Sequence, residues 1–354
     1  MSSKFGNKKR FKIYFELLIL IICSIIGVGF ISGAEIYQFF AKYYKFFWLG
    51  EIVFFMLVFI LSRKIFITSK NANFDIKLHK NNEYSHKNSI LFKNKVKTIL
   101  IFFDVLMISS AMISGLRNMI YKLFNNNHIF IFLACVFVVF VLLCVGIKGL
   151  SKFDYLVIVF ACAVSVLLFA TLITNNLGVN QKYETPVTSV SGESIVLPIV
   201  FAALYVFMNI ISIEPVIREY SSNFSRKSIN VFCLILSLVL TAILTLFILF
   251  MRANSGLSRY AMPLLEYFSH FGNGVYIFYV FGLFLALISS LLGCLVGVKR
   301  ETSKFVKNNV LASGLCVVVA LTLGMIDFSV FVSIIYPIIG AVNFIVLLLW
   351  NYTY

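Results

Sequence analysis

Charged residues are scarce in this sequence of 354 residues. Asp, Glu, Lys and Arg together make up 12% of the chain, whereas apolar residues make up 61% and aromatic residues 16%. This composition lies far outside the range of soluble proteins. It indicates an all-α integral membrane protein with no separate soluble domain.

Clusters of metal-binding, disulfide-forming or catalytic residues are also lacking. The seven Cys residues all lie in apolar segments without a C-x-x-C pair, and the four His residues are scattered. This excludes a disulfide framework or a Cys/His metal centre. No nucleophile, base and orienting group converge in the apolar segments, so we expect neither an enzyme nor a cofactor, apart from Na⁺ as a coupling ion.

The apolar segments are long enough for about ten membrane spans of some 20 residues each. They begin near Ile13, Phe46, Thr98, His128, Phe153, Ser194, Ile229, Gly274, Asn309 and Phe328. With both chain ends placed in the cytoplasm, 23 of the 30 Lys and Arg residues fall on the cytoplasmic side, as the positive-inside rule requires. The net charge of +16 is therefore explained by topology, and nucleic-acid binding is not expected.

The spacing of the spans suggests an internal duplication. The starts of the first five and the last five spans are offset by 181, 183, 176, 181 and 175 residues. Because five is odd, the second copy enters from the opposite side, which gives a five-plus-five inverted repeat, although evenly spaced helices could produce part of this regularity. The predicted organisation is a cytoplasmic tail (1–12), a first repeat (13–174), an external connection (175–193) and a second repeat (194–351).

The first span carries three glycines, Gly27, Gly29 and Gly33, followed by Glu35. Each glycine costs about 1 kcal/mol of helix propensity, and unwound backbone in a bilayer must be buried in protein or line a cavity. The pattern therefore predicts a helix broken around Val28, as in secondary transporters. Free amides near these glycines would bind the anionic group of a substrate.

The segment from Gly27 to Ile36 resembles the first-span signature G-x-G-F-x-S-G-x-E of the YkvI-like bacterial membrane proteins. That family is uncharacterised, but it is similar to the LeuT-fold transporters of the amino acid, polyamine and organocation (APC) superfamily. The resemblance covers the whole chain and implies that helices 1 and 6 are broken. In helix 6 it implies substrate contacts from Tyr205 and Asn209, although no glycine marks a break there.

The same resemblance implies a sodium site between the first and eighth spans. Its ligands would be the carbonyls of Cys23, Ile26 and Ala286 and the hydroxyls of Ser289 and Ser290. The alternative is that the two serines bond to their own helix or pack helices closely.

Other intramembrane polar residues are candidates for further roles. Glu35 either couples and gates transport or caps the outer half-helix, and Asp104 faces the cavity or another span. Ser109 and Ser110 are candidates for substrate contact, and Phe30 is a candidate lid, against the alternative of core packing. The external stretch 254–273 resembles an interfacial or gate-capping helix.

The sequence thus predicts a secondary transporter in the bacterial cytoplasmic membrane. It would carry a small organic solute, such as an amino acid, by alternating access coupled to Na⁺ or H⁺. The alternative is a membrane sensor or regulatory protein that keeps this fold without transport. Besides the solute, the lipid bilayer is the expected partner.

Overall fold

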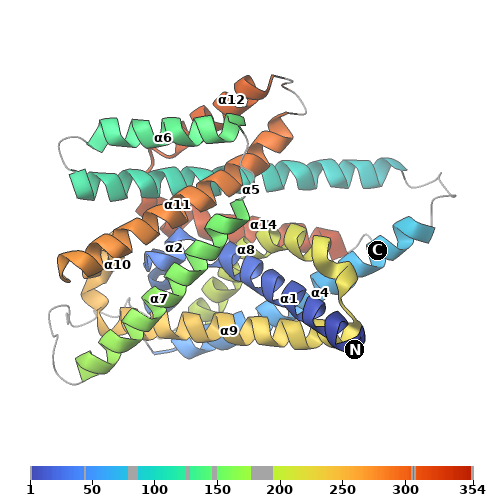
Figure 1. The fold of residues 1–354 in the computed structure, drawn as a ribbon, viewed down its shortest axis with the longest axis horizontal. Coiled ribbons are helices and arrows are strands. Elements are labelled where there is room, and N and C mark those ends of the chain that lie inside the picture. The colour runs from blue at the N-terminus through green and yellow to red at the C-terminus, as the bar shows by residue number, and fades with distance from the viewer. Residues whose placement is uncertain are drawn as a thin grey trace.

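A computed structural model describes residues 2–351 apart from 44, 79–86, 125–127, 146–149, 177–193, 304–305 and 307. Over these residues the chain is helical throughout, with 14 α-helices and no strand (Figure 1). Most of the predicted connection 175–193 lies outside the described part. The first helix begins at Ser2 and includes residues of the predicted tail 1–12, whose place in the cytoplasm stays a prediction.

Ten helices of the described residues correspond in order to the ten predicted spans, and two of them, α1 and α5, begin eleven residues before the predicted starts at Ile13 and Thr98. The ten are α1 (Ser2–Ile25), α4 (Phe47–Leu78), α5 (Lys87–Phe124), α6 (His128–Val145), α7 (Leu150–Asn176), α8 (Val196–Tyr220), α9 (Arg226–Ala253), α11 (Asn273–Thr302), α12 (Asn309–Leu323) and α14 (Tyr336–Asn351). Within the described residues, six helical stretches are long and apolar enough to cross a membrane, and parts of α1, α8 and α12 form shorter apolar helices.

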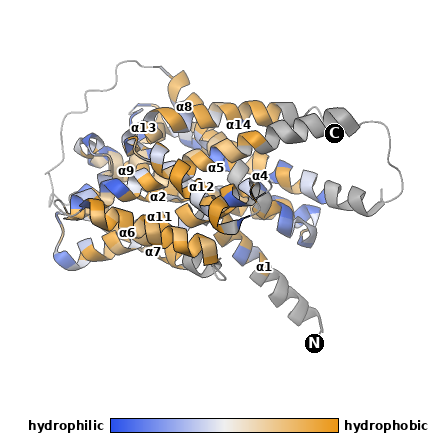
Figure 2. Ribbon diagram, turned by 90° about the horizontal axis from the view of Figure 1, so that it is seen from above, coloured by the Kyte–Doolittle hydropathy of each residue, from blue (hydrophilic) through white to orange (hydrophobic). Residues whose placement is uncertain are grey.

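The outer surface of this bundle is apolar. Large side chains such as Phe130 and Val145, each 79% exposed, and Val159, 67% exposed, point away from the interior. Figure 2 shows hydrophobic residues along most of the helices and hydrophilic ones mainly toward their ends. A soluble protein rarely exposes such a surface, so lipid is its natural solvent and the chain is a multi-pass membrane protein.

The helices form two packed groups. In the first group, α4 packs against α8 and α9, α1 contacts both α8 and α9, and α14 packs along α8. In the second group, α5 packs against α6, α11 and α12, and α7 contacts both groups through α9 and α11. Figure 1 shows α5, α6 and α12 on one side of the molecule and α1 and α9 on the other.

The first span is broken, as the glycines predict. It continues after α1 as α2 (Val28–Ile31), α3 (Ala34–Ile36) and a π-helix, η1 (Tyr37–Ala41). The Gly27 backbone is extended, with φ −79° and ψ −174°, and its amide donates to the Ile25 carbonyl rather than to the residue four before it. Gly33 has φ +81°, a left-handed conformation that glycine adopts without a steric penalty.

The prediction that helix 6 is broken is wrong, because α8 is one continuous helix that runs through Asn209 and Pro215. The Asn209 side chain donates a hydrogen bond to the Tyr205 carbonyl, 2.9 Å away in the same helix. This carbonyl belongs to an unbroken part of α8, so the bond does not replace a lost helical one. The segment 200–214 contains no glycine that would lower the cost of unwinding.

The stretch between α9 and α11, predicted to be one external helix, forms two short helices. They are η4 (Ser255–Arg259) and α10 (Pro263–Phe268). The Leu264 amide donates to the Ser32 carbonyl at 2.9 Å, so this segment covers the interrupted part of the first span. The Lys122 ammonium at the end of α5 pairs with Glu266 of α10.

The last span is also irregular where it begins. It starts with α13 (Phe328–Val330) and a second π-helix, η5 (Phe331–Ile335), before α14. The Ser114 hydroxyl of α5 donates to the Ile326 carbonyl at 2.6 Å, and Arg117 donates to the Met325 carbonyl at 2.7 Å. These bonds fix the turn before the last span to α5.

Candidate functional site

The interrupted first span surrounds a buried carboxyl group. Glu35 is 4% exposed, and its side chain folds back over Gly29. A Cβ atom at position 29 would lie 2.0 Å from Glu35 Oε1, so only glycine leaves room for the carboxyl in this position. The sequence predicted both residues as part of a site, and the structure brings them into contact.

The Glu35 carboxyl is bonded across to α8. The Tyr205 hydroxyl donates to Glu35 Oε2 at 3.1 Å, and Tyr205 is fully buried. Rings of Phe39, Phe40 and Phe54 surround Tyr205, with centroids 5.2 to 6.1 Å away. Buried carboxyl groups are costly in an apolar interior unless they are hydrogen-bonded, and the Tyr205 hydroxyl supplies one such bond.

Tyr336, at the start of α14, lies within electrostatic range of both Glu35 and Tyr205. It is 1% exposed, and its hydroxyl has no hydrogen-bond partner among the described residues. No role was predicted for Tyr336 from the sequence. The chain has 17 tyrosines, and the sequence does not distinguish Tyr336 from the others. It becomes a candidate only when the start of the last span is known to pack beside the first span.

The carbonyls of the break are held from two directions. The Tyr279 hydroxyl of α11 donates to the Ile31 carbonyl at 3.0 Å, and the Leu264 amide donates to the Ser32 carbonyl. Val28, Phe30 and Ile31 are almost completely buried, and the Phe30 ring lies 5.0 Å from that of Phe247 on α9. The interrupted backbone is therefore enclosed by protein, as a bilayer requires.

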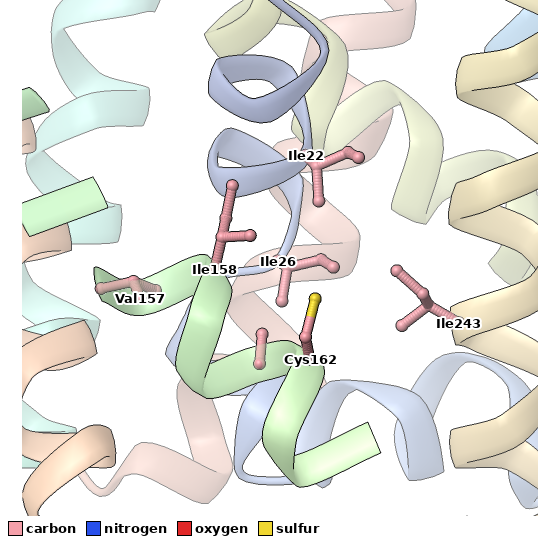
Figure 3. Close-up of a pocket in the computed structure, with 7 residues that line it drawn as sticks. Ile22, Ile26, Val157, Ile158, Cys162 and Ile243 are labelled. Atoms are coloured by element: carbon pink, nitrogen blue, oxygen red, sulfur yellow. The ribbon is translucent and has the colours of Figure 1, made fainter. Parts of the chain in front are cut away.

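The space beside the break is apolar in this conformation. A pocket is lined by side chains of α1, the break, α7 and α9: Ile22, Ile26, Val157, Ile158, Ala161, Cys162 and Ile243 (Figure 3). Such a pocket offers no hydrogen bonds to a polar solute. Gly27 borders open space, since a Cβ there would meet nothing within 4 Å.

Several candidate residues bond within their own helices. The hydroxyls of Ser109 and Ser110 both donate to the Leu106 carbonyl, at 2.7 and 2.8 Å. These are bonds that serines often form in membrane helices. The contact of Ser109, Ser110 and Asn209 with a substrate stays a prediction.

The candidate sodium ligands lie on α1 and its break and on α11. Ile26 follows the end of α1, and on α11 Ala286 and Ser289 are buried and Ser290 is half-buried. The helix α11 does reach the first span, because it packs against α2 and bonds Ile31 through Tyr279. A cation between Cys23, Ile26 and these α11 residues stays a prediction.

Asp104 forms a second buried polar pair. The Asn343 amide of α14 donates to Asp104 Oδ2 at 2.6 Å, and the two residues are 1% and 6% exposed, respectively. The sequence predicted that Asp104 faces the cavity or another span, and the structure shows that it faces α14. Asn343 was missed, although an amide in the middle of the last span is a signal that could have identified it.

Comparison with known proteins agrees with the membrane assignment. No family model matches the chain. It is 22% identical over 340 residues to the uncharacterized membrane protein YkvI of Bacillus subtilis (strain 168), covering 93% of this chain and 92% of that protein. The similarity extends along nearly the whole chain, so this protein is a distant homologue of a membrane protein whose function is not characterised.

Proposed function

We propose that this protein is a secondary active transporter of a small organic solute, such as an amino acid, driven by Na⁺ or H⁺. It would lie in the bacterial cytoplasmic membrane with both chain ends in the cytoplasm. The observation that carries the proposal is the double interruption of the first span, at Gly27 and Gly33, around the buried carboxyl of Glu35. Discontinuous helices with backbone groups at membrane depth are typical of secondary transporters.

The grouping of the helices supports a repeat of five spans. The first two spans of each half, in α1, α4, α8 and α9, pack together, and the third and fourth spans of each half, in α5, α6, α11 and α12, form the other group. Two copies of one unit would pair in this way. It is the arrangement expected for a relative of the LeuT-fold APC transporters, from which the continuous α8 is a departure.

Alternating access would then be a movement of one group against the other. The enclosed break represents a closed conformation, and separating α11 from α2 would uncover the amides near Gly27 and Gly29 for an anionic group. The Tyr279 bond to Ile31 is one contact that this opening must break.

Uptake by the purified protein in liposomes tests this function. We expect a pH or Na⁺ gradient to drive accumulation of at least one solute from a radiolabelled mixture of the twenty standard amino acids. If amino acids bind in a thermal-shift screen but no gradient drives uptake, the protein is a sensor or regulator that keeps this architecture.

The predicted sodium site is tested separately. If Na⁺ drives uptake through this site, the double variant Ser289→Ala with Ser290→Ala loses the Na⁺ dependence, because both hydroxyl ligands are removed. Undiminished Na⁺ stimulation in the double variant would exclude these two hydroxyls as ligands.

A further inference from the structure

A groove lies on the outer surface of the bundle where three helices meet. α1, α7 and α9 contact one another in pairs, and the apolar pocket of Figure 3 lies between them. Its inner wall is buried, since Ile26 and Ala161 are only 3% and 7% exposed. At its mouth the Cys162 side chain is exposed, and Ile158 and Ile243 are half-buried. The groove is therefore closed on the inside and open toward the membrane.

The groove exists because α7 carries small side chains at this level. Ala161 shares the buried face of α7 with two larger side chains, Val157 and Val164, one turn before and one turn after it. Cys162, beside it, is also small. Protein interiors are close-packed, and the walls of an empty gap lose the dispersion contacts that a neighbour would supply. A gap that opens to the membrane regains these contacts when a molecule fills it.

The lining of the groove selects an apolar occupant. Six of its seven side chains are hydrocarbon, and the seventh, Cys162, offers only a thiol, which is a weak hydrogen-bond donor. A charged or zwitterionic solute would lose its hydration there without gaining hydrogen bonds in return. The mouth also continues the lipid-facing surface, because Val159 and Val166, one turn on either side of Cys162, are both 67% exposed. The hydrocarbon nearest to the groove is thus the acyl chain of a lipid.

The depth of the groove indicates which leaflet supplies this chain. In the predicted orientation, Val157 follows the cytoplasmic start of its span at Phe153 by four residues, and Ile22 follows Ile13 by nine. These spacings correspond to about 6 and 14 Å along the helices, within the cytoplasmic half of a hydrocarbon core about 30 Å thick. The groove is also short, since Ile22 and Ile26 are about 6 Å apart along α1. It fits the end of one chain from the cytoplasmic leaflet.

We propose that the groove between α1, α7 and α9 binds one acyl chain of a phospholipid from the cytoplasmic leaflet. The chain fills the gap beside Ala161 and acts as a wedge that holds the end of α1 in position against α7. It contacts Ile26, which directly precedes Gly27, where the backbone of the first span leaves helical geometry. Bound lipid thereby stabilises the conformation in which the break is enclosed. This site does not depend on whether the protein transports a solute.

Photo-cross-linking of the full chain in phosphatidylglycerol vesicles tests the site. A small share of the lipid carries a diazirine at the end of one acyl chain, and the labelled residues are quantified by mass spectrometry. We expect labelling at Cys162 and Ile243 to exceed that at Val138, which is 53% exposed on α6. Ala161→Leu, which fills the groove, should remove the excess at Ile243. The matched control Ala170→Leu, at an exposed position of the same helix, should leave it unchanged.

Cys162→Phe provides a second variant, because it closes the mouth from an exposed position and decides the test if Ala161→Leu does not fold. The unfolding temperature in detergent, measured as phosphatidylglycerol is added, is the second readout. It should rise for the wild type and for Ala170→Leu, and rise less for the two filling variants.

Three results would overturn the proposal. The first is labelling at Cys162 and Ile243 that only equals that at Val138, which would mean surrounding lipid without a bound chain. The second is an excess that persists in Cys162→Phe. The third is an excess that disappears when a mixture of the twenty standard amino acids is added, which would assign the groove to a solute instead of a lipid.

Discussion

Replacing Gly29 by alanine should separate the Glu35 carboxyl from Tyr205. The new Cβ would lie 2.0 Å from Oε1 and 2.4 Å from Cδ of Glu35, so the flexible end of the glutamate must move. The bond from the Tyr205 hydroxyl is then lost in a buried site. A buried polar group without its partner costs about 1–3 kcal/mol. Alanine also gains about 1 kcal/mol of helix propensity over glycine. The net loss of unfolding free energy is therefore about 0–2 kcal/mol.

A double-mutant cycle isolates the contact. In a Glu35→Ala background no carboxyl is displaced, so Gly29→Ala should be neutral or stabilising. The coupling energy between positions 29 and 35 should be about 1–3 kcal/mol, within the range measured for residues in contact. Gly27→Ala is a matched control, because its Cβ would meet nothing within 4 Å.

The assay is denaturant or thermal unfolding of the detergent-solubilised protein, followed for the four members of the cycle. Tyr205→Phe offers a second background, in which the cost of Gly29→Ala should also fall, since the bond is already absent. An equal effect of Gly29→Ala with and without the Glu35 side chain would refute the reasoning, because it would show that the carboxyl does not occupy the space over Gly29.

Three further changes have expected outcomes in the same unfolding assay. Gly33→Ala places a side chain at φ +81° and should cost about 1–2 kcal/mol, so an unchanged stability would contradict the left-handed conformation. Gly340→Ala should cost about 1–3 kcal/mol, because its Cβ meets the backbone of Leu204 rather than a movable side chain, and a neutral effect would disprove that close approach. Lys42, in the connection after η1, has a pKa lowered to about 8 by burial. The unfolded chain therefore binds more protons above this pH, and stability should rise between about pH 8 and 10. The rise should be absent in Lys42→Met.

The sequence predicted the positions of the apolar helices because apolar length is a strong signal, but it missed the polar first turns of α1 and α5, which begin eleven residues before the predicted starts. The expected starts at His128, Asn309 and Phe328 coincide with the starts of α6, α12 and α13. The break in the first span was also predictable, since three glycines and an acid have no reason to occur in a plain anchor. The resemblance to transporters predicted a break in helix 6. The segment 200–214 has no glycine that would favour a break, and the structure shows a continuous helix there.

The partners of the buried acids could not be predicted from the sequence. Glu35 and Tyr205 are 170 residues apart, and Asp104 and Asn343 are 239 apart. Each acid was a candidate because charge is rare in a membrane span. Which tyrosine or amide meets it depends on how the helices pack, and aromatic residues are too abundant here for composition to decide.

The two π-helices have a consequence for the neighbourhood of Glu35. η1 directly follows α3, η5 directly precedes Tyr336, and Gln38 of the first donates to the Ser333 carbonyl of the second at 3.3 Å. A π turn accommodates one more residue than an α turn. Relaxation of η5 to ordinary α geometry would rotate everything after it by about 100°. The Tyr336 hydroxyl would then swing away from the carboxyl while α14 moves only about 1.5 Å along its axis, so the wide turn would let the last span rotate with little translation.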